Sequence, residues 1–390
     1  MRTPVVLLCG QGATDDVARE LQSSPGTVLV RHAFDGHVVV RSVATGTDTS
    51  EWALELAHGC VSCTVRDDLL VLLRRLHRRS DVRRIVVVLM AWLEPEPVCW
   101  AIENIEVQVG PGYIDGPAAR DVRIDGVVTC IDTAAWLPES LGEDELDDGR
   151  TVAQVVVGQA ELADVLVLTE PESTTLAVLR RLSPTARITT GPERVELALS
   201  HLEPNSRRGR PVDPHDPLLT GEPPLDRDGE VGIVEFVARR PFHPVRLHEA
   251  LDVLLDGVVR ARGRAWLASQ PDDVVYLESA GGGLRVSHAG RWLAAMDHHE
   301  RAYADPQRLA LAAVGWDERF GDRHISLTAI VCGARPDDIV ATLRDALLTD
   351  DELEADWTEY PDPFGDWHEE PCETPVEETA NPGHHEGERS

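Results

Sequence analysis

Short runs of β-branched and other apolar residues alternate with helical patterns through the first two hundred residues of the chain. The runs are continuous and contain few polar residues, which is typical of strands that are buried on both faces. They lie at Val5–Leu8, Thr27–Val30, Ile85–Met90, Val127–Ile131 and Val165–Leu168. This order predicts an α/β domain over residues 1–202, in which helices wrap a parallel sheet.

The clearest predicted helix follows Thr64 and carries an apolar stripe opposite a cluster of arginines. The stripe consists of Leu69, Leu72, Leu73 and Leu76, and the cluster of Arg74, Arg75, Arg78 and Arg79. Such a cluster has two interpretations. It binds phosphate or an acidic partner, or it is a solvated helix face that is partly paired with the protein's own carboxylates. The overall charge favours the second, since 68 acidic residues stand against 37 basic ones.

All 37 basic residues are arginine, so mechanisms that need a lysine, such as a P-loop lysine or a Schiff base, are excluded. The net charge of −31 argues against a general nucleic-acid partner, which needs a basic face. The longest apolar run, Ile85 to Leu93, is far shorter than the ~20 residues of a membrane-spanning helix. The N-terminal apolar run is too short for a signal peptide. We therefore expect a cytoplasmic protein with no membrane partner.

The composition changes twice in the second half of the chain. Residues 203–230 are rich in Pro, Arg, Asp and Gly and predict a linker. Residues 231–348 predict a smaller α+β domain with helices at Leu247–Val259 and Pro336–Leu348 and strands at Asp273–Glu278, Gly283–Ser287 and His324–Val331. Residues 349–390 hold 15 acidic residues and one arginine, which predicts a disordered acidic tail.

The segment HGCVSCTVRDDLL, residues 58–70, places Cys60 and Cys63 two residues apart on a loop that feeds a helix. Two thiolates at this spacing can face one soft ion, and a helix N-terminus favours the thiolate form. The pair predicts half of a Zn²⁺ site. Because zinc usually takes four ligands, two more are needed, and His58, Cys9 or a partner molecule are the candidates. A redox dithiol and a pair of unconnected buried thiols remain as alternatives.

A second motif, LLCGQGATDD at residues 7–16, is a glycine-bearing turn between a strand and a helix pattern. Such a turn points backbone N–H groups at whatever lies above it, which suits phosphate. A tight turn without a ligand is an equal alternative, because the loop is short and ends in Asp15 and Asp16.

Histidines gather in two acidic segments of the chain. These are Asp297-His298-His299-Glu300 and the tail segment with His368, Cys372, His384 and His385. Histidine, cysteine and carboxylate are ligands for zinc and similar metals, so the tail is either a metal-capturing arm or a solubilising segment with incidental histidines.

The cysteine motif and the glycine turn resemble those of the CobW-type GTP-binding family of metal-insertion and zinc-chaperone proteins. The same resemblance is carried by EPEPVCWAI, RIDGVVTCIDTAAW, VVGQAELADVLVLTEPE and VEFVARRPFHPVRL with RARGRAWLAS. The resemblance covers most of residues 1–348. It implies a P-loop NTPase-like, G-domain-like fold followed by a CobW C-terminal domain. It also implies GTP with Mg²⁺ as cofactor, Zn²⁺ at the cysteine motif, and a client protein that receives the metal. The nucleotide would lie at Gly10, Gly12 and Thr14 of the phosphate loop and at Thr169 and Glu172 of the guanine loop.

The chain departs from the family pattern at every nucleotide element. The phosphate loop is shortened and lacks its lysine, Val88-Leu89-Met90-Ala91 stands where the family has Glu and Gly, and Thr169-Glu170-Pro171-Glu172 replaces Asn-Lys-x-Asp. Ser62 replaces one of three motif cysteines. Since losing one electrostatic donor commonly costs ~10²–10³ in rate, we predict a zinc metallochaperone with weak or absent GTP turnover. The alternative function is a non-enzymatic scaffold or regulator on a pseudo-GTPase fold.

Overall fold

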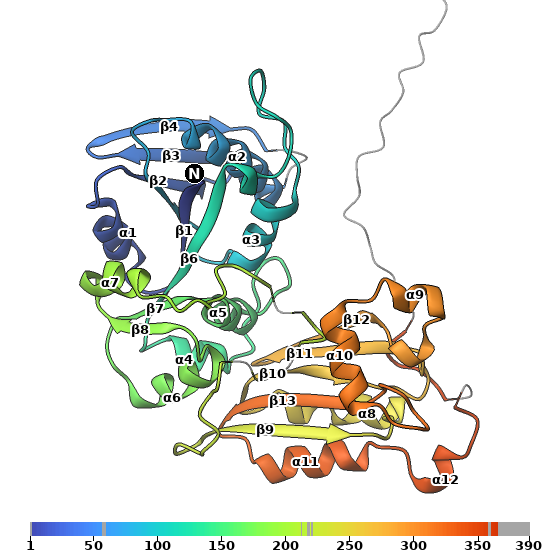
Figure 1. The fold of residues 1–390 in the computed structure, drawn as a ribbon. Helices are drawn as coiled ribbons and strands as arrows, with labels where there is room; N and C mark the ends of the chain where they lie inside the picture. The colour runs from blue at the N-terminus through green and yellow to red at the C-terminus, as the bar shows by residue number, and fades with distance from the viewer. Residues whose placement is uncertain are drawn as a thin grey trace, which may run out of the picture.

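A computed structural model describes residues 2–56, 60–211, 213–216, 219, 221–357 and 360–365. The described residues form two α/β units, each built on its own sheet (Figure 1). Within these ranges, every helix is too short or too polar to cross a lipid bilayer.

The N-terminal unit contains an eight-stranded sheet in the order β4-β3-β2-β5-β1-β6-β7-β8. Six strands are parallel, while β3 and β4 extend one edge as an antiparallel hairpin. The strands are β1 (Thr3–Gly10), β2 (Thr27–Phe34), β3 (Val39–Thr45), β4 (Asp48–Leu54), β5 (Arg84–Val88), β6 (Val122–Ile131), β7 (Val165–Leu168) and β8 (Arg187–Thr190). The prediction of a parallel sheet wrapped by helices is confirmed.

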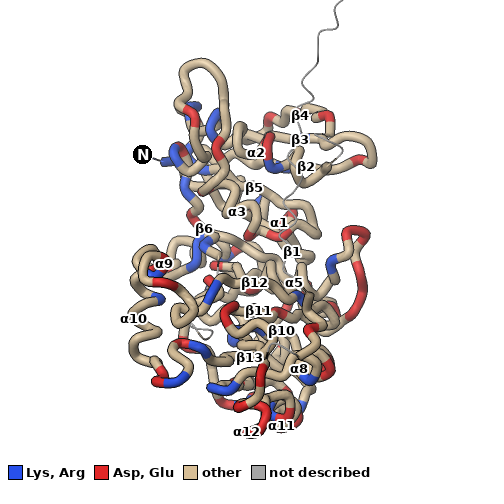
Figure 2. Tube along the Cα trace, turned by 90° about the vertical axis from the view of Figure 1, so that its right-hand side faces the viewer, with Lys and Arg blue, Asp and Glu red and all other residues tan. Residues whose placement is uncertain are grey.

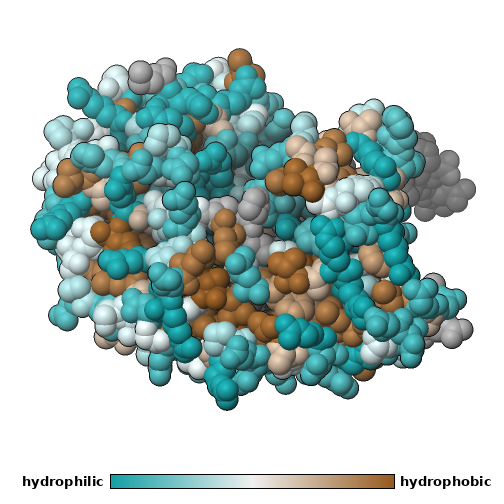
Figure 3. Space-filling view, turned by 60° about the horizontal axis from the view of Figure 1, so that its bottom comes forward, coloured by the Kyte–Doolittle hydropathy of each residue, from teal (hydrophilic) through white to brown (hydrophobic). Residues whose placement is uncertain are grey.

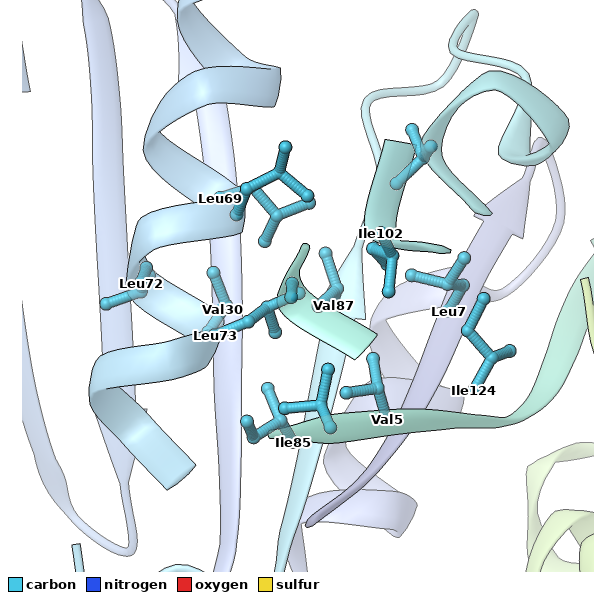
Figure 4. Close-up of a cluster of buried hydrophobic side chains, with 14 of the residues drawn as sticks. Val5, Leu7, Val30, Leu69, Leu72, Leu73, Ile85, Val87, Ile102 and Ile124 are labelled. Carbon is cyan, nitrogen blue, oxygen red and sulfur yellow. The ribbon is translucent and has the colours of Figure 1, made fainter. Parts of the chain in front are cut away.

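Helices cover both faces of this sheet because its central strands contain runs that are apolar on both faces. On β1, Val5 and Leu7 pack into the cluster with helices α2 and α3 (Figure 4), whereas Val6 and Leu8 pack into the cluster with α1. The helices of this unit are α1 (Thr14–Gln22), α2 (Val61–His77), α3 (Pro95–Asn104), α4 (Trp136–Ser140), α5 (Val152–Glu161), α6 (Ser173–Leu182) and α7 (Val195–Ser200). The sheet is therefore the middle layer of three.

The C-terminal unit contains an antiparallel five-stranded sheet in the order β12-β11-β10-β13-β9. Its strands are β9 (Val231–Ala238), β10 (Val258–Ala265), β11 (Asp273–Ala280), β12 (Gly283–Arg291) and β13 (Ile325–Cys332). Its helices are α8 (Pro244–Ala250), α9 (His298–Ala302), α10 (Pro306–Gly315), α11 (Pro336–Asp345) and α12 (Asp350–Leu353). The face turned forward in Figure 3 shows separate apolar patches among hydrophilic side chains.

The predicted helix at Leu247–Val259 is wrong in its second half. Helix α8 ends at Ala250 and a 3₁₀ turn runs from Leu251 to Leu254, after which Gly257 adopts a positive φ of 67°. A Cβ at Gly257 would lie 2.5 Å from the backbone nitrogen of Ala334, so only glycine fits this turn. The apolar residues that follow it belong to strand β10.

The segment predicted to be a disordered tail from residue 349 is ordered in its first part. Helix α12 is capped by Thr349, and Glu352 pairs with Arg246 of α8 at 2.7 Å. The Trp357 ring lies edge-on to Trp266, with centroids 5.8 Å apart. These aromatic and ion-pair contacts offset the ordering cost that the acidic composition alone suggests. Acidic residues gather around α11 and α12 in Figure 2.

The described part of the predicted linker, residues 203–230, contains no helix or strand but is held against both units. The backbone N–H of Arg208 donates to the Asp164 carboxylate at 2.9 Å, and Arg264 of β10 donates to the carbonyl oxygen of Pro214 at 2.8 Å. The units also meet directly, because Glu161 of α5 pairs with Arg260 and Arg262 of β10. The segment is thus part of the junction.

Candidate metal site and nucleotide cleft

Cys60 is the N-cap of helix α2, which begins at Val61 and not after Thr64 as predicted. Its backbone is extended, with φ −101° and ψ 118°, and its Sγ accepts a hydrogen bond from the backbone N–H of Cys63 at 3.3 Å. The side chain therefore takes the place of the Ser or Asp oxygen that commonly caps a helix. Both thiols lie in the first turn and are partly exposed to solvent.

The two thiols have different acidities. The N–H of Cys63 and a hydrogen bond from the Cys63 side chain lower the pKa of Cys60. The same side-chain contact raises the pKa of Cys63. A lowered thiol pKa at a helix N-terminus is typical of cysteines that bind metal or react as thiolates. Cys60 is thus the thiol that ionises first.

Helix α2 is fixed to the sheet one turn beyond the cysteines. Its Asp68 accepts hydrogen bonds from His32 of β2 at 2.8 Å and from Arg41 of β3 at 2.6 Å. His32 is buried. Because Asp68 joins the helix to two strands, the start of α2 has a defined position at the edge of the N-terminal unit.

Among the other candidate ligands, the structure describes Cys9. Cys9 lies inside the sheet, where burial raises its pKa to about 12 and its thiol contacts Thr129 Oγ1 at 3.3 Å. The Cys9 thiol is thus buried and in contact with Thr129, away from solvent. His58 lies outside the described residues, as do His368, Cys372, His384 and His385. Within the described part of the chain, no group of three or more His, Cys, Asp or Glu side chains is arranged to hold a metal ion.

The described histidine motif at residues 297–300 forms a helix cap. Asp297 and Glu300 make a capping box at the start of α9, and Glu300 also pairs with Arg291 at 3.1 Å. These two carboxylates are thus occupied by backbone N–H groups and an arginine.

The turn between β1 and α1 is folded tightly against β6. Gly10 has φ 105°, and a Cβ there would lie 2.1 Å from the carbonyl oxygen of Cys130. The N–H of Gly12 donates to the same carbonyl at 3.0 Å, and the Thr14 hydroxyl donates to the Gly10 carbonyl at 3.2 Å. N–H and hydroxyl donors that the resemblance assigns to phosphate are thus used within the protein.

The Gln11 side chain joins this turn to the segment after β5. Its Nε2 donates to the carbonyl oxygen of Ala91 at 2.8 Å and to the Gln159 side chain at 3.2 Å. Gln159 is buried and also donates to Ala91. Sequence patterns did not predict this pair, and the available signal is a glutamine in a short glycine turn. The first three residues after β5 are Leu89, Met90 and Ala91, none of which has a carboxylate to hold Mg²⁺.

The segment that resembles the guanine loop also bonds internally. Thr169 Oγ1 accepts the backbone N–H of Thr133 at 3.2 Å. Glu172 is the N-cap of α6 and accepts the N–H of Thr175 at 2.6 Å and that of Thr174 at 3.0 Å. These backbone bonds lower the pKa of Glu172 to about 2. Both Glu172 oxygens are bound to its own helix and do not point freely at a base.

The arginine cluster on α2 divides between buried and exposed positions. Arg74 is 2% exposed, pairs with Asp121 at 2.8 Å and donates to the carbonyl oxygens of Val107, Gly116 and Ile114. The prediction that Arg74 belongs to a solvated helix face is wrong. Arg78 stacks on the Tyr113 ring, and Arg79 pairs with Asp81, so these two are engaged within the protein.

Comparisons with known proteins agree with this arrangement of domains. Residues 231–347 match the family model of the cobalamin synthesis protein cobW C-terminal domain. Residues 30–187 match the CobW/HypB/UreG nucleotide-binding domain. This chain belongs to the CobW family of nucleotide-binding proteins, as the sequence predicts.

Two relatives show which members of the family this chain is similar to. The chain is 65% identical over 378 residues to Zinc chaperone Rv0106 of Mycobacterium tuberculosis, with 95% of each chain covered. It is 26% identical over 340 residues to Zinc-regulated GTPase metalloprotein activator 1 of Dictyostelium discoideum, which covers 81% of this chain and 70% of that one. A solved structure, Zn(II)-bound YjiA GTPase from E. coli, covers 89% of this chain and 100% of its own at 14% identity and TM-score 0.39, too distant a likeness to argue from.

Proposed function

We propose that this protein is a zinc metallochaperone that carries Zn²⁺ on Cys60 and Cys63 and passes it to a client protein. The observation that carries the proposal is the position of both thiols in the first turn of α2, where Cys60 Sγ accepts a backbone N–H. A helix N-terminus favours negative charge, so it favours the thiolates that bind zinc. The name of the Mycobacterium tuberculosis relative supports the same role.

Two thiolates supply half of a tetrahedral zinc site. In our proposal His58 and groups from the client complete it. A site with few ligands of its own suits a carrier, because an incoming client ligand can bind the ion before the carrier releases it. We expect the protein in the cytoplasm, where thiols stay reduced.

We further infer that GTP and Mg²⁺ have been lost as working cofactors, so that turnover is weak or absent. Three features support this inference: the Gly12 N–H bonds to Cys130 and the Thr14 hydroxyl bonds within the turn, Gln11 ties the turn to Ala91, and Glu172 caps its own helix. In addition, no lysine is available to hold the β- and γ-phosphates.

The non-enzymatic scaffold remains a second candidate, because the internal bonds of Gln11 favour a cleft that serves only as a folded platform. A scaffold has no need of the two thiols. The zinc experiment therefore separates the two hypotheses.

The experiment titrates zinc into reduced full-length protein against a chromogenic chelator. We expect the wild type to retain stoichiometric zinc and the Cys60→Ala/Cys63→Ala variant to lose it. Cys332→Ala is the matched control, since Cys332 is a buried thiol of β13 in the other unit. If the double variant kept the same zinc stoichiometry, the zinc site would have to be assigned to the histidines. No zinc in the wild type would favour the scaffold, or a redox dithiol if Cys60 and Cys63 oxidise reversibly.

The nucleotide inference is tested separately by GTP titration and phosphate release with the same protein. We expect no saturable binding at micromolar GTP and no turnover above the buffer rate. Micromolar affinity with steady turnover would contradict the loss of nucleotide function without affecting the zinc proposal.

A further inference from the structure

The C-terminal unit contains a pocket of about 250 Å³ that neither zinc carriage nor nucleotide binding uses. Its walls come from strand β10, helix α10, the residues that directly follow β9 and β12, the residues that directly precede β13, and His215 of the segment between the two units. Three arginines line it, Arg239, Arg264 and Arg308, together with His215, His324 and Trp292. The pocket is positively charged in a chain whose net charge is −31.

These arginines lack the acidic partners that many other arginines of the protein have. Within the described residues, none of the three forms an ion pair. Arg264 donates to the carbonyl oxygens of Pro214 and Asp216, and Arg308 donates to that of Arg291. For Arg239 the described residues provide no hydrogen-bond partner. Carbonyl oxygens orient a guanidinium but leave its positive charge in place.

Asp216 lies near Arg264, and three other nearby carboxylates are bound to backbone N–H groups. Asp322, the acidic residue among the described lining residues, accepts the N–H groups of Leu293 at 2.9 Å and Ala294 at 2.8 Å. Asp213 and Asp317 lie near the arginines and likewise accept backbone N–H groups. The guanidinium groups therefore remain available to an incoming anion.

The two histidines experience this positive environment. Burial, followed by Arg308, lowers the pKa of His215, while burial and the charges of Arg264 and Arg239 lower the pKa of His324. Each ring has one nitrogen at a backbone carbonyl oxygen, that of Ala289 for His215 and that of Asp322 for His324. Neutral histidines reduce the repulsion among the arginines without neutralising the pocket.

The remaining walls are apolar. Trp292 is 2% exposed and packs against His324, with ring centroids 5.5 Å apart. Leu311 and Ala312 of α10 also line the pocket. The volume and these walls fit a small molecule that carries an anionic group.

We propose that this pocket binds a small oxyanion-bearing molecule, whose phosphate or carboxylate group is held by Arg239, Arg264 and Arg308. Guanidinium groups recognise both kinds of oxyanion through paired N–H donors. A bound oxyanion also relieves repulsion among three arginines that share one pocket. Binding should therefore stabilise the folded protein by mass action.

The experiment titrates inorganic phosphate and, separately, succinate into full-length protein at constant ionic strength, with sodium chloride as the reference salt. Calorimetry measures the affinity, and a thermal melt measures the rise in Tm. The variant is Arg239→Gln, which removes a charge without breaking a described hydrogen bond. Arg285→Gln is the matched control, because Arg285 is an exposed arginine of β12 that does not line this pocket.

We expect saturable binding of one of the two anions, weakened about tenfold or more in Arg239→Gln and unchanged in Arg285→Gln. The anion that binds more tightly shows whether the ligand's oxyanion group is a phosphate or a carboxylate. No saturable binding of either anion, or equal affinity in the wild type and Arg239→Gln, would overturn the proposal.

Discussion

The Nε2 of Gln11 donates a hydrogen bond to the carbonyl oxygen of Ala91 at 2.8 Å, joining the turn after β1 to the segment after β5. These two segments lie at the carboxyl ends of neighbouring parallel strands, where an open α/β sheet commonly binds its ligand. In this protein a side chain bridges them. The nucleotide-binding fold is thus retained with its cleft tied by the protein's own polar groups.

Replacing Gln11 by Ala should weaken the fold without restoring nucleotide function. The change removes hydrogen bonds to Ala91 and Gln159, which are worth about 0.5–1.5 kcal/mol each. Urea unfolding should show a loss of about 1–3 kcal/mol. Phosphate release from GTP should stay at background, because the loop still lacks a lysine. Turnover in this variant would show that Gln11 alone blocks a competent site.

Glu172→Ala tests the capping role of the residue in the guanine-loop position. Loss of an N-cap should cost about 0.5–2 kcal/mol at pH 7. The folded-state pKa of Glu172 is depressed to about 2, so its contribution is fully present above the unfolded value near 4.3 and is lost as pH falls towards 2.

The difference in unfolding free energy between the wild type and Glu172→Ala should therefore shrink as the pH falls from about 4 through 2. Glu170→Ala is the matched control, since Glu170 is an exposed neighbour outside the helix. A difference that does not shrink between pH 4 and pH 2 would contradict the capping account.

Arg74→Met should be among the most destabilising single changes in the N-terminal unit. It leaves Asp121 without its ion-pair partner and the Ile114 carbonyl oxygen without a donor, and it removes the bonds of Arg74 to Val107 and Gly116, so we expect a loss of about 3–5 kcal/mol. Arg75→Met, on the exposed side of the same turn, should change stability by less than about 0.5 kcal/mol. Equal effects in denaturant unfolding would show that Arg74 is dispensable.

Ser62→Cys restores a third thiol between Cys60 and Cys63. Ser62 is exposed in the first turn of α2, so the substitution should be tolerated by the fold. An added thiolate ligand should tighten zinc binding by about tenfold or more, which is about 1.4 kcal/mol. The measurement is chelator competition. An unchanged affinity would show that zinc does not contact this turn.

Continuous apolar runs predicted the central strands well, because a strand buried on both faces must be apolar at each position. The run Val165–Leu168 is strand β7 with the same bounds. The hairpin of β3 and β4 was missed, since β4 is largely exposed and its sequence DTSEWAL has no apolar run. Strand β8, with sequence RITT, was missed because it is short and largely polar.

The sequence predicted the motifs of the candidate sites, but it predicted much less of their geometry. The Cys-x-x-Cys spacing located the thiols, but it did not reveal that Cys60 caps the helix. Helical spacing placed Arg74 among exposed arginines, whereas the loop of residues 107–116 covers it. That contact joins residues more than thirty positions apart, and periodicity carries no information about such distant partners.

The central claim, that Cys60 and Cys63 together bind the metal, is tested most directly with Co²⁺ in place of zinc. The sulfur-to-cobalt charge-transfer absorption in the near ultraviolet grows with the number of bound thiolates. We predict that Cys60→Ala and Cys63→Ala each remove about half of this absorption and that the double variant abolishes it, while Cys332→Ala retains it. Full absorption in the double variant would contradict the account.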